Sequence, residues 1–209
     1  MDELTEWRRA ATEYLEWWCS TDRRLISEFS TEITCPKLAD MFSPAKYKVA
    51  RTVPGYGPGK YASLARELNS LRQVVATEEN VPTVIEALCF KMSNEYGKFI
   101  PSAISKALWM MKGHPVAVYE RLAKGGLRRV GFTFNDLYHG YFTAWLALFK
   151  RSDTQQALVN AAAWLPGSPV AEGLIRTRRI TQEELNQLVA SPRFGNRTLD
   201  VWLMNKALA

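Results

Sequence analysis

The sequence predicts an all-α protein that folds as a single unit of two packed helical lobes. Apolar residues recur at spacings of three and four through most of the chain, which is the helical period. The length of 209 residues corresponds to roughly one and a half domains of ordinary size. The composition is 47% apolar and 23% charged, which is typical of globular proteins and excludes a disordered or fibrous one.

Helical patterns begin near the N-terminus and are then interrupted by a loop. We expect a first helix over 4–18, which continues over 22–29 after a break. Residues 31–59 contain four prolines and three glycines, so they predict a long loop with short helices in it. Two further helices are expected over 60–75 and 81–91.

The second half of the chain carries most of the predicted helices. Helical spacing and end signals place them over 102–112, 135–151, 155–164, 181–189 and 198–207. Thr181, followed three residues later by Glu184, has the pattern of a capping box. The apolar run 116–119 is a strand candidate.

Charge and cysteine usage narrow the class of protein. The net charge of +6 is compatible with a nucleic-acid partner. No apolar run reaches the ~18 residues of a membrane span, and the first thirty residues show no signal or transit peptide. Three widely spaced cysteines argue against a disulfide framework and a zinc site. We therefore expect a cytoplasmic protein in a reducing, bacterial-type cytosol.

Several ligand motifs are tested and fail. The glycine-rich segment 53–60 has Pro54 and Tyr61 where a P-loop requires glycine and a Ser or Thr. It remains a structural turn, or a helix start whose free N–H groups hold a phosphate. Only two histidines occur and no cluster has metal-ligand spacing, so we expect no metal and no other cofactor.

The segment 101–127 carries the residues with the clearest chemistry. Ser102 is expected to cap an apolar helix, and Lys106 lies in its first turns. Partial desolvation and the positive end of the helix dipole would both lower the pKa of this lysine and favour a neutral, nucleophilic amine. Glu120 follows an apolar run fourteen residues later, and a turn over 112–115 could bring it back toward Lys106. The alternatives are a lysine that extends to solvent and an acid that forms an ordinary surface pair with Arg121 or begins a helix.

Four short motifs within 95–205 match a known family when taken together. They are Ser105-Lys106-Ala107-Leu108-Trp109, then Pro115 with Tyr119-Glu120 and Leu127, then Tyr141 with Trp145, and finally Arg197, Asp200, Trp202 and Leu203. This set resembles prokaryotic proteins with the 8-oxoguanine DNA glycosylase fold, which belong with the helix-hairpin-helix glycosylases. The resemblance implies a helix-hairpin-helix-glycosylase-like fold, which we expect over 1–209 as one domain; its first 90 residues match no motif.

The function that the resemblance implies is a DNA N-glycosylase. Such an enzyme flips a modified base out of double-stranded DNA and excises it, which leaves an abasic site. Some bacterial members excise glucosylated hydroxymethylcytosine from phage DNA as an antiphage defence, and the similar size and pattern make this our preferred substrate. The alternatives are an oxidised-purine (8-oxoguanine) repair glycosylase with lyase activity, a non-catalytic nucleic-acid-binding protein, and a helical interaction module. We expect no membrane and no obligate protein partner.

The resemblance also suggests which residues act. Lys106 corresponds to the catalytic lysine and Glu120 to the catalytic acid, although the family normally has Asp there. The glycine-bearing hairpin that precedes the lysine in the wider superfamily is absent. Candidates for the base pocket are Trp109, Tyr119, Trp17, Trp18, Tyr138 and His139. Candidates for the DNA backbone are Arg121, Lys124, Gly125, Gly126, Arg128, Arg129 and Lys60, with a second basic cluster at Arg176, Arg178 and Arg179.

Overall fold

The structure is a computed structural model that describes residues 2–43 and 58–209, without the side chains of Pro58 and Lys60. The described residues form helices and turns and contain no strand, which confirms the all-α prediction. None of their helices has the length and apolar character needed to cross a membrane. The chain divides into two compact units, and each is built from segments far apart in the sequence.

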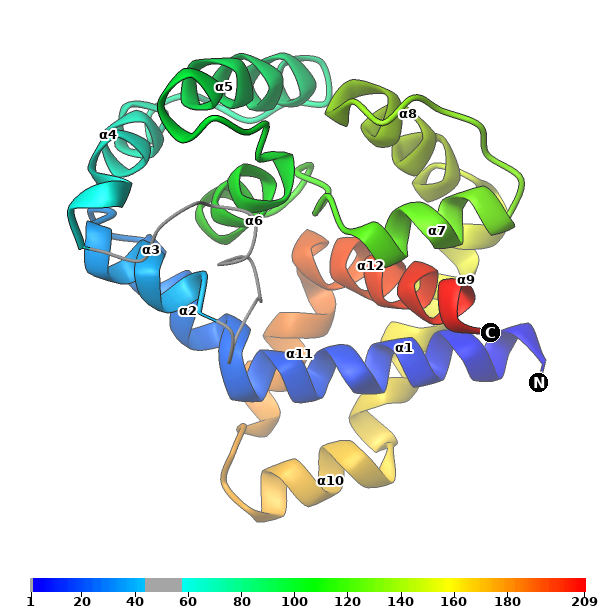
Figure 1. Cartoon of the computed structure of the whole chain (residues 1–209). Helices are drawn as coiled ribbons and strands as arrows, with labels where there is room; N and C mark the ends of the chain where they lie inside the picture. Colours follow the sequence, from blue (N-terminus) through cyan, green and yellow to red (C-terminus); the bar gives the residue numbers. More distant parts are fainter. Residues whose placement is uncertain (1, 44–57) are drawn as a thin grey trace. The chain divides into compact units, whose positions relative to one another are not determined.

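Unit 1 comprises Met1–Ser20, Glu120–Asp136 and Gly140–Ala209. Its centre is helix α12, which packs against α7 on one side and α1 on the other (Figure 1). The indole rings of Trp7 and Trp202 stack between α1 and α12, with ring centroids 4.5 Å apart. The helices of this unit are α1 Glu3–Trp17, α7 Arg121–Arg129, most of α8 Tyr138–Phe149, α9 Ser152–Trp164, α10 Pro169–Arg176, α11 Gln182–Ala190 and α12 Pro192–Leu208.

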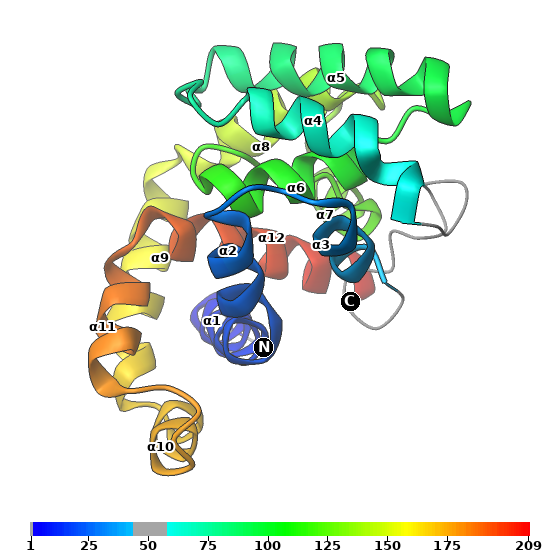
Figure 2. The ribbon, with the colours of Figure 1, turned by 90° about the vertical axis from the view of Figure 1, so that its left-hand side faces the viewer.

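Unit 2 comprises Thr21–Tyr119 and Leu137–His139. Helix α6 packs against both α5 and α2 in this unit (Figure 2). Its helices are α2 Arg23–Phe29, α3 Cys35–Met41, α4 Ala62–Ser70, α5 Asn80–Tyr96 and α6 Pro101–Lys112, with a 3₁₀ turn at Pro58–Tyr61. The helix α3 is one of the short helices expected in the loop 31–59, and residues 44–57 of that loop lie outside the described residues.

Local signals explain where the helices begin and end. Asp2 caps α1, because its carboxylate accepts a hydrogen bond from the Thr5 backbone N–H at 2.8 Å. The capping box of α11 is confirmed, since Thr181 and Glu184 exchange side-chain-to-backbone hydrogen bonds of 2.9 and 3.1 Å. The break predicted after the first helix is a π-helical turn, Trp18–Asp22, that links α1 to α2.

Two helices, α7 and α10, were not predicted from the sequence. The strand candidate 116–119 is wrong, because the described residues contain no strand.

Candidate active site

Lys106 lies in the second turn of α6, and the whole of 103–110 is buried around it. The lysine is 3% exposed, so it does not extend to solvent as one alternative proposed. The predicted apolar helix is confirmed, but its predicted cap is wrong. The helix begins at Pro101, and Ser102 lies inside its first turn. Proline is well suited to that first position because the N–H that it lacks would have no partner there.

The chain returns to α6 after the helix ends, as the sequence predicted. Gly113 ends α6 with a positive φ of 70°, which glycine adopts without strain. The following segment then runs back along the helix, and the backbone N–H of Tyr119 donates a hydrogen bond to Ser105 Oγ at 3.0 Å. Ser105 is fully buried. The bond therefore fixes Tyr119, the residue before Glu120, beside the residue before Lys106.

The predicted pocket aromatics of unit 2 are mostly core residues. The rings of Tyr119 and Tyr138 lie 6.1 Å apart, and the Tyr138 hydroxyl donates to the Ala117 carbonyl at 2.8 Å. Trp109 and Tyr138 are fully buried and Tyr119 nearly so. His139 is exposed, and its backbone N–H donates to Glu86. Tyr119 and Tyr138 are thus brought together, whereas His139 lies on the surface of the unit.

Glu120 is the first residue of unit 1 after the chain leaves unit 2, and it occupies the N-cap position of α7. Its side chain is half-buried and makes no capping hydrogen bond. Its charge acts on Asp200 of α12, where it is one of the influences that raise the pKa of that buried acid. Unit 1 therefore holds two carboxyl groups in one neighbourhood, one half-buried and one fully buried.

Asp200 connects two of the motifs noted in the sequence. It accepts a hydrogen bond from the Trp145 indole N–H at 2.8 Å and pairs with Arg197 at 3.3 Å. Burial raises the pKa of Asp200 to about 7, against the lowering effects of the Arg197 charge and of the hydrogen bonds from Trp145 and Arg197. Neither Asp200 nor Arg197 was predicted as a site residue. Their Arg-x-x-Asp spacing was the available signal, because residues three apart share a helix face.

The two candidate tryptophans of α1 and its π-helical turn have different surroundings. The Arg197 guanidinium lies over the Trp17 ring, 5.3 Å from its centroid. Trp18 makes an edge contact with Tyr14, with ring centroids 6.4 Å apart. Both tryptophans are half-buried. Trp17 is therefore joined to the Asp200 cluster through Arg197, and Trp18 is part of a separate aromatic contact.

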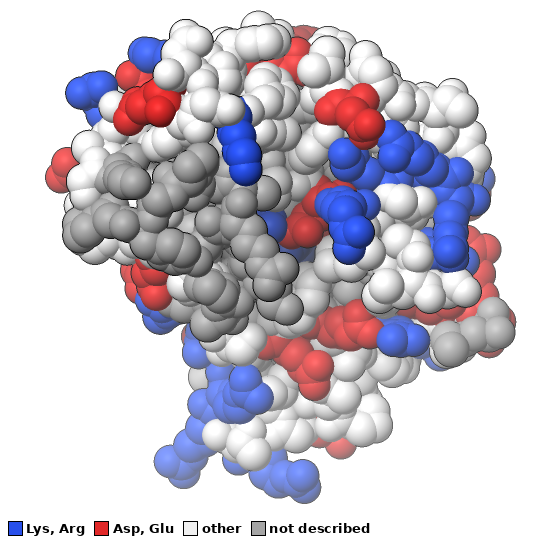
Figure 3. All heavy atoms as spheres, viewed as in Figure 1, with Lys and Arg blue, Asp and Glu red and all other residues white. Residues whose placement is uncertain are grey.

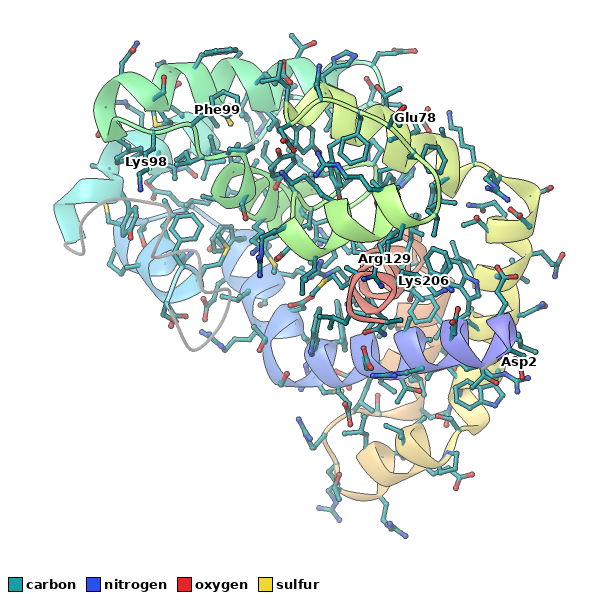
Figure 4. The ribbon with its side chains drawn as sticks, turned by 45° about the vertical axis from the view of Figure 1, so that its right-hand side comes forward. Asp2, Glu78, Lys98, Phe99, Arg129 and Lys206 are labelled. Carbon is teal, nitrogen blue, oxygen red and sulfur yellow. The ribbon has the colours of Figure 1, made fainter. Side chains whose placement is uncertain are left out.

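The predicted cations of α7 gather on one surface of unit 1 (Figure 3). Lys124 and Arg128 both bind Asp136 Oδ1, at 3.0 and 2.8 Å. Hydrogen bonds from these two cations lower the pKa of Asp136. Arg129 donates a hydrogen bond to the backbone carbonyl of Lys206 at 3.0 Å. Figure 4 shows Arg129 on α7, beside the end of α12 that carries Lys206. Arg121 is exposed.

The paired glycines of α7 serve helix packing. A Cβ atom on Gly126 would lie 2.0 Å from the Leu203 carbonyl oxygen, and one on Gly125 would lie 3.3 Å from Ala207 Cβ. The close approach that Gly126 allows is therefore to the backbone of α12 and not to an external phosphate, contrary to the expectation. The side chain of Lys60 lies outside the described residues, so that candidate is not placed.

The predicted site residues are thus distributed over both units. Lys106, Trp109, Tyr119, Tyr138 and His139 belong to unit 2, and Glu120, Trp17, Trp18 and the α7 residues belong to unit 1. Within 2–43 and 58–209, no group of three or more His, Cys, Asp or Glu side chains is arranged to hold a metal ion.

Comparison of the chain with models of protein families, with curated proteins and with solved structures finds no match.

Proposed function

We propose that the protein is a DNA N-glycosylase, with a helix-hairpin-helix-glycosylase-like fold, that extrudes a modified base from duplex DNA and excises it to leave an abasic site. The observation that carries the proposal is the hydrogen bond between Tyr119 and Ser105. It anchors the residue before the acid to the residue before a buried lysine. The next residues along the chain are Glu120 and Lys106.

A carboxylate and a nucleophile both assist the breaking of an N-glycosidic bond. Positive charge develops on the sugar as the base departs with the electron pair of the C1′–N bond, and a carboxylate near C1′ stabilises that charge. In our proposal Glu120 supplies this carboxylate. Lys106 supplies an amine that attacks C1′, or it orients the water that does so. The proton lost by the attacking group passes to Glu120.

Two further observations support the proposal. The motif Tyr141–Trp145 on α8 and the motif Arg197–Leu203 on α12 contact each other in unit 1, through the hydrogen bond from Trp145 to Asp200. The α7 surface offers guanidinium groups that suit the phosphates of a DNA backbone. We propose that Arg121, Arg128 and Arg129 make such contacts, with Lys124 beside them.

The first experiment is a base-release assay on duplexes that contain glucosylated hydroxymethylcytosine, 8-oxoguanine or uracil. Free base is identified by mass spectrometry, and abasic sites are detected by alkaline strand cleavage. We expect release from the glucosylated substrate, and a decrease of about 10²–10⁴-fold in E120Q, which keeps the size of the side chain but removes its charge. Release of 8-oxoguanine alone would contradict the proposed substrate. DNA binding without release of any base would contradict the proposed glycosylase activity and favour a non-catalytic nucleic-acid-binding protein.

The second experiment asks whether Lys106 is the nucleophile. After an amine replaces the base at C1′, the C1′–O4′ bond of the sugar breaks, O4′ takes a proton and a Schiff base forms, which borohydride reduces to a stable protein–DNA adduct. We expect the wild-type protein and K112M to form the adduct and K106M to form none. Lys112 is the matched control because it lies at the end of the same helix and bonds the Arg72 carbonyl in the folded protein. An adduct in K106M would contradict the assignment of Lys106, and base release without any adduct would assign the attack to water.

A further inference from the structure

The turn between α10 and α11 carries a second group of cations that the proposed active site does not use. Arg176 ends α10, and Arg178 and Arg179 follow it before α11 begins. All three side chains are exposed. Figure 3 shows Lys and Arg gathered over the end of unit 1 where α10 lies.

These three arginines lack carboxylate partners within the described residues, unlike several other surface cations of the protein. Lys124 and Arg128 share Asp136, and Arg151 pairs with Asp153. No carboxylate within the described residues pairs with Arg176, Arg178 or Arg179. Their positive charge is therefore not neutralised inside the chain, and it is available to an external anion.

The backbone at Arg178 is a second, independent indication. Its φ is +57°, and it is the only residue other than glycine with a positive φ in the described part of the chain. The backbone N–H groups of Arg178 and Arg179 both close the end of α10, with bonds of 2.9 Å to the carbonyls of Ile175 and Leu174. Glycine adopts this helix-ending conformation most easily. An arginine in this conformation carries backbone strain, and strained residues cluster at functional sites. We therefore infer that the Arg178 side chain has a function.

The position of the cluster separates it from the α7 surface. Helix α10 packs on α1, whereas α7 packs on α12. Figures 1 and 2 both show α1 and α12 lying between α7 and α10 within unit 1. The two basic surfaces therefore cannot bind the same phosphate.

We propose that Arg176, Arg178 and Arg179 form a second contact surface for the phosphate backbone of duplex DNA. Guanidinium groups bind phosphate oxygens through paired, charge-assisted hydrogen bonds. Such contacts hold DNA without reading its sequence. This inference rests on the proposed function, because it assigns DNA as the anion. It adds a second contact with the duplex, made by residues other than those of α7.

The test is the salt dependence of binding to an unmodified duplex, measured by fluorescence anisotropy. The slope of log K against log salt concentration should become shallower by about 0.9 for each arginine that contacts a phosphate. We expect a change of about 0.9 for each of the single variants R176Q, R179Q and R178G. The triple variant should show the sum of the three changes. The matched control is R9Q/R24Q/R151Q, which removes the same charge from arginines paired with Glu13, Asp40 and Asp153. Its slope should stay at the wild-type value.

The R178G variant separates binding from folding. Glycine relieves the backbone strain, so the melting temperature should be unchanged or higher while the affinity for DNA falls. Equal slopes in the wild type and the triple variant, or an equal change in the control, would overturn the proposal.

Base release measured on the same samples keeps this inference distinct from the proposed function. Unchanged slopes with normal base release would remove the second surface and leave the glycosylase. Slopes that depend on the three arginines, without base release from any substrate, would contradict the glycosylase and leave the DNA-binding surface.

Discussion

At the scale of single residues, Asp200 has the most informative environment in unit 1. It is fully buried, and its oxygens are occupied by the Trp145 indole and the Arg197 guanidinium. Burying an ionised acid is unfavourable unless partners compensate for the lost hydration. Here the partners compensate only in part, so the pKa of Asp200 rises to about 7. Asp200 is therefore close to its titration point near neutral pH.

This raised pKa predicts a pH-dependent stability. The ordinary value is 3.8, so between about pH 4 and about pH 7 the folded protein keeps a proton that the unfolded chain releases. The contribution of Asp200 is complete below this window and is lost as the pH rises through it. D200N cannot titrate at this position, so it does not lose this contribution as the pH rises. Its free energy of unfolding, relative to that of the wild type, should therefore increase from about pH 4.5 to about pH 7.5. Urea denaturation at both pH values measures the gap.

The control for this prediction is D136N. The pKa of Asp136 is lowered by Lys124 and Arg128, so its contribution changes only below its ordinary pKa and the gap between D136N and the wild type should be constant over the same window. A constant gap for D200N as well would show that the pKa of Asp200 is not raised.

At the scale of elements, the packing of α7 on α12 explains the two consecutive glycines in α7. The helices approach so closely at Gly126 that any side chain there would overlap the α12 backbone at Leu203. Backbone atoms cannot move away as the end of a flexible side chain can. The glycines therefore place α7, and with it Glu120 at its N-terminus, at a fixed distance from α12.

G126A tests this packing directly. The added Cβ must displace a backbone, which typically costs about 1–3 kcal/mol or more of unfolding free energy. The control is G173A in α10, where no atom lies within 4 Å of the added Cβ. Because alanine favours a helix over glycine, G173A should gain about 0.5–1 kcal/mol. Chemical denaturation compares both with the wild type, and equal stability of G126A would refute the close approach.

The same elements show what could be predicted from the sequence. The helices α1, α6 and α8 were predictable because each has a helical apolar pattern and end signals. Helix α7 was missed because Gly125-Gly126 disfavours a helix locally, and only its packing against α12 compensates. The start of α12 was missed because that helix is buried on all sides near Asp200, which hides the usual period.

The candidate site was predictable only in part, for a related reason. Lys106 was identified because it is the one charged residue in the first turns of an apolar helix, and it is buried. A return of the chain toward α6 was expected from the turn over 112–115, and the hydrogen bond from Tyr119 to Ser105 shows such a return. Arg197 and Asp200 were named only as motif members. Their importance comes from Trp145 and Trp17, which are distant in sequence and reach them through tertiary packing.

At the scale of the whole molecule, the chain passes between its two units four times, and one crossing lies between Tyr119 and Glu120. In our proposal Lys106 and Glu120 belong to one catalytic site. Lys106 and Glu120 should therefore act together, and their contributions to the rate of base release should not be independent.

A double-mutant cycle in single-turnover base release from glucosylated DNA tests that claim most directly. We predict that K106M, E120Q and the double variant all lose about the same factor in rate, because removing either residue disables the pair. If either single variant keeps the wild-type rate, or if the two losses multiply in the double variant, Lys106 and Glu120 do not form one catalytic site.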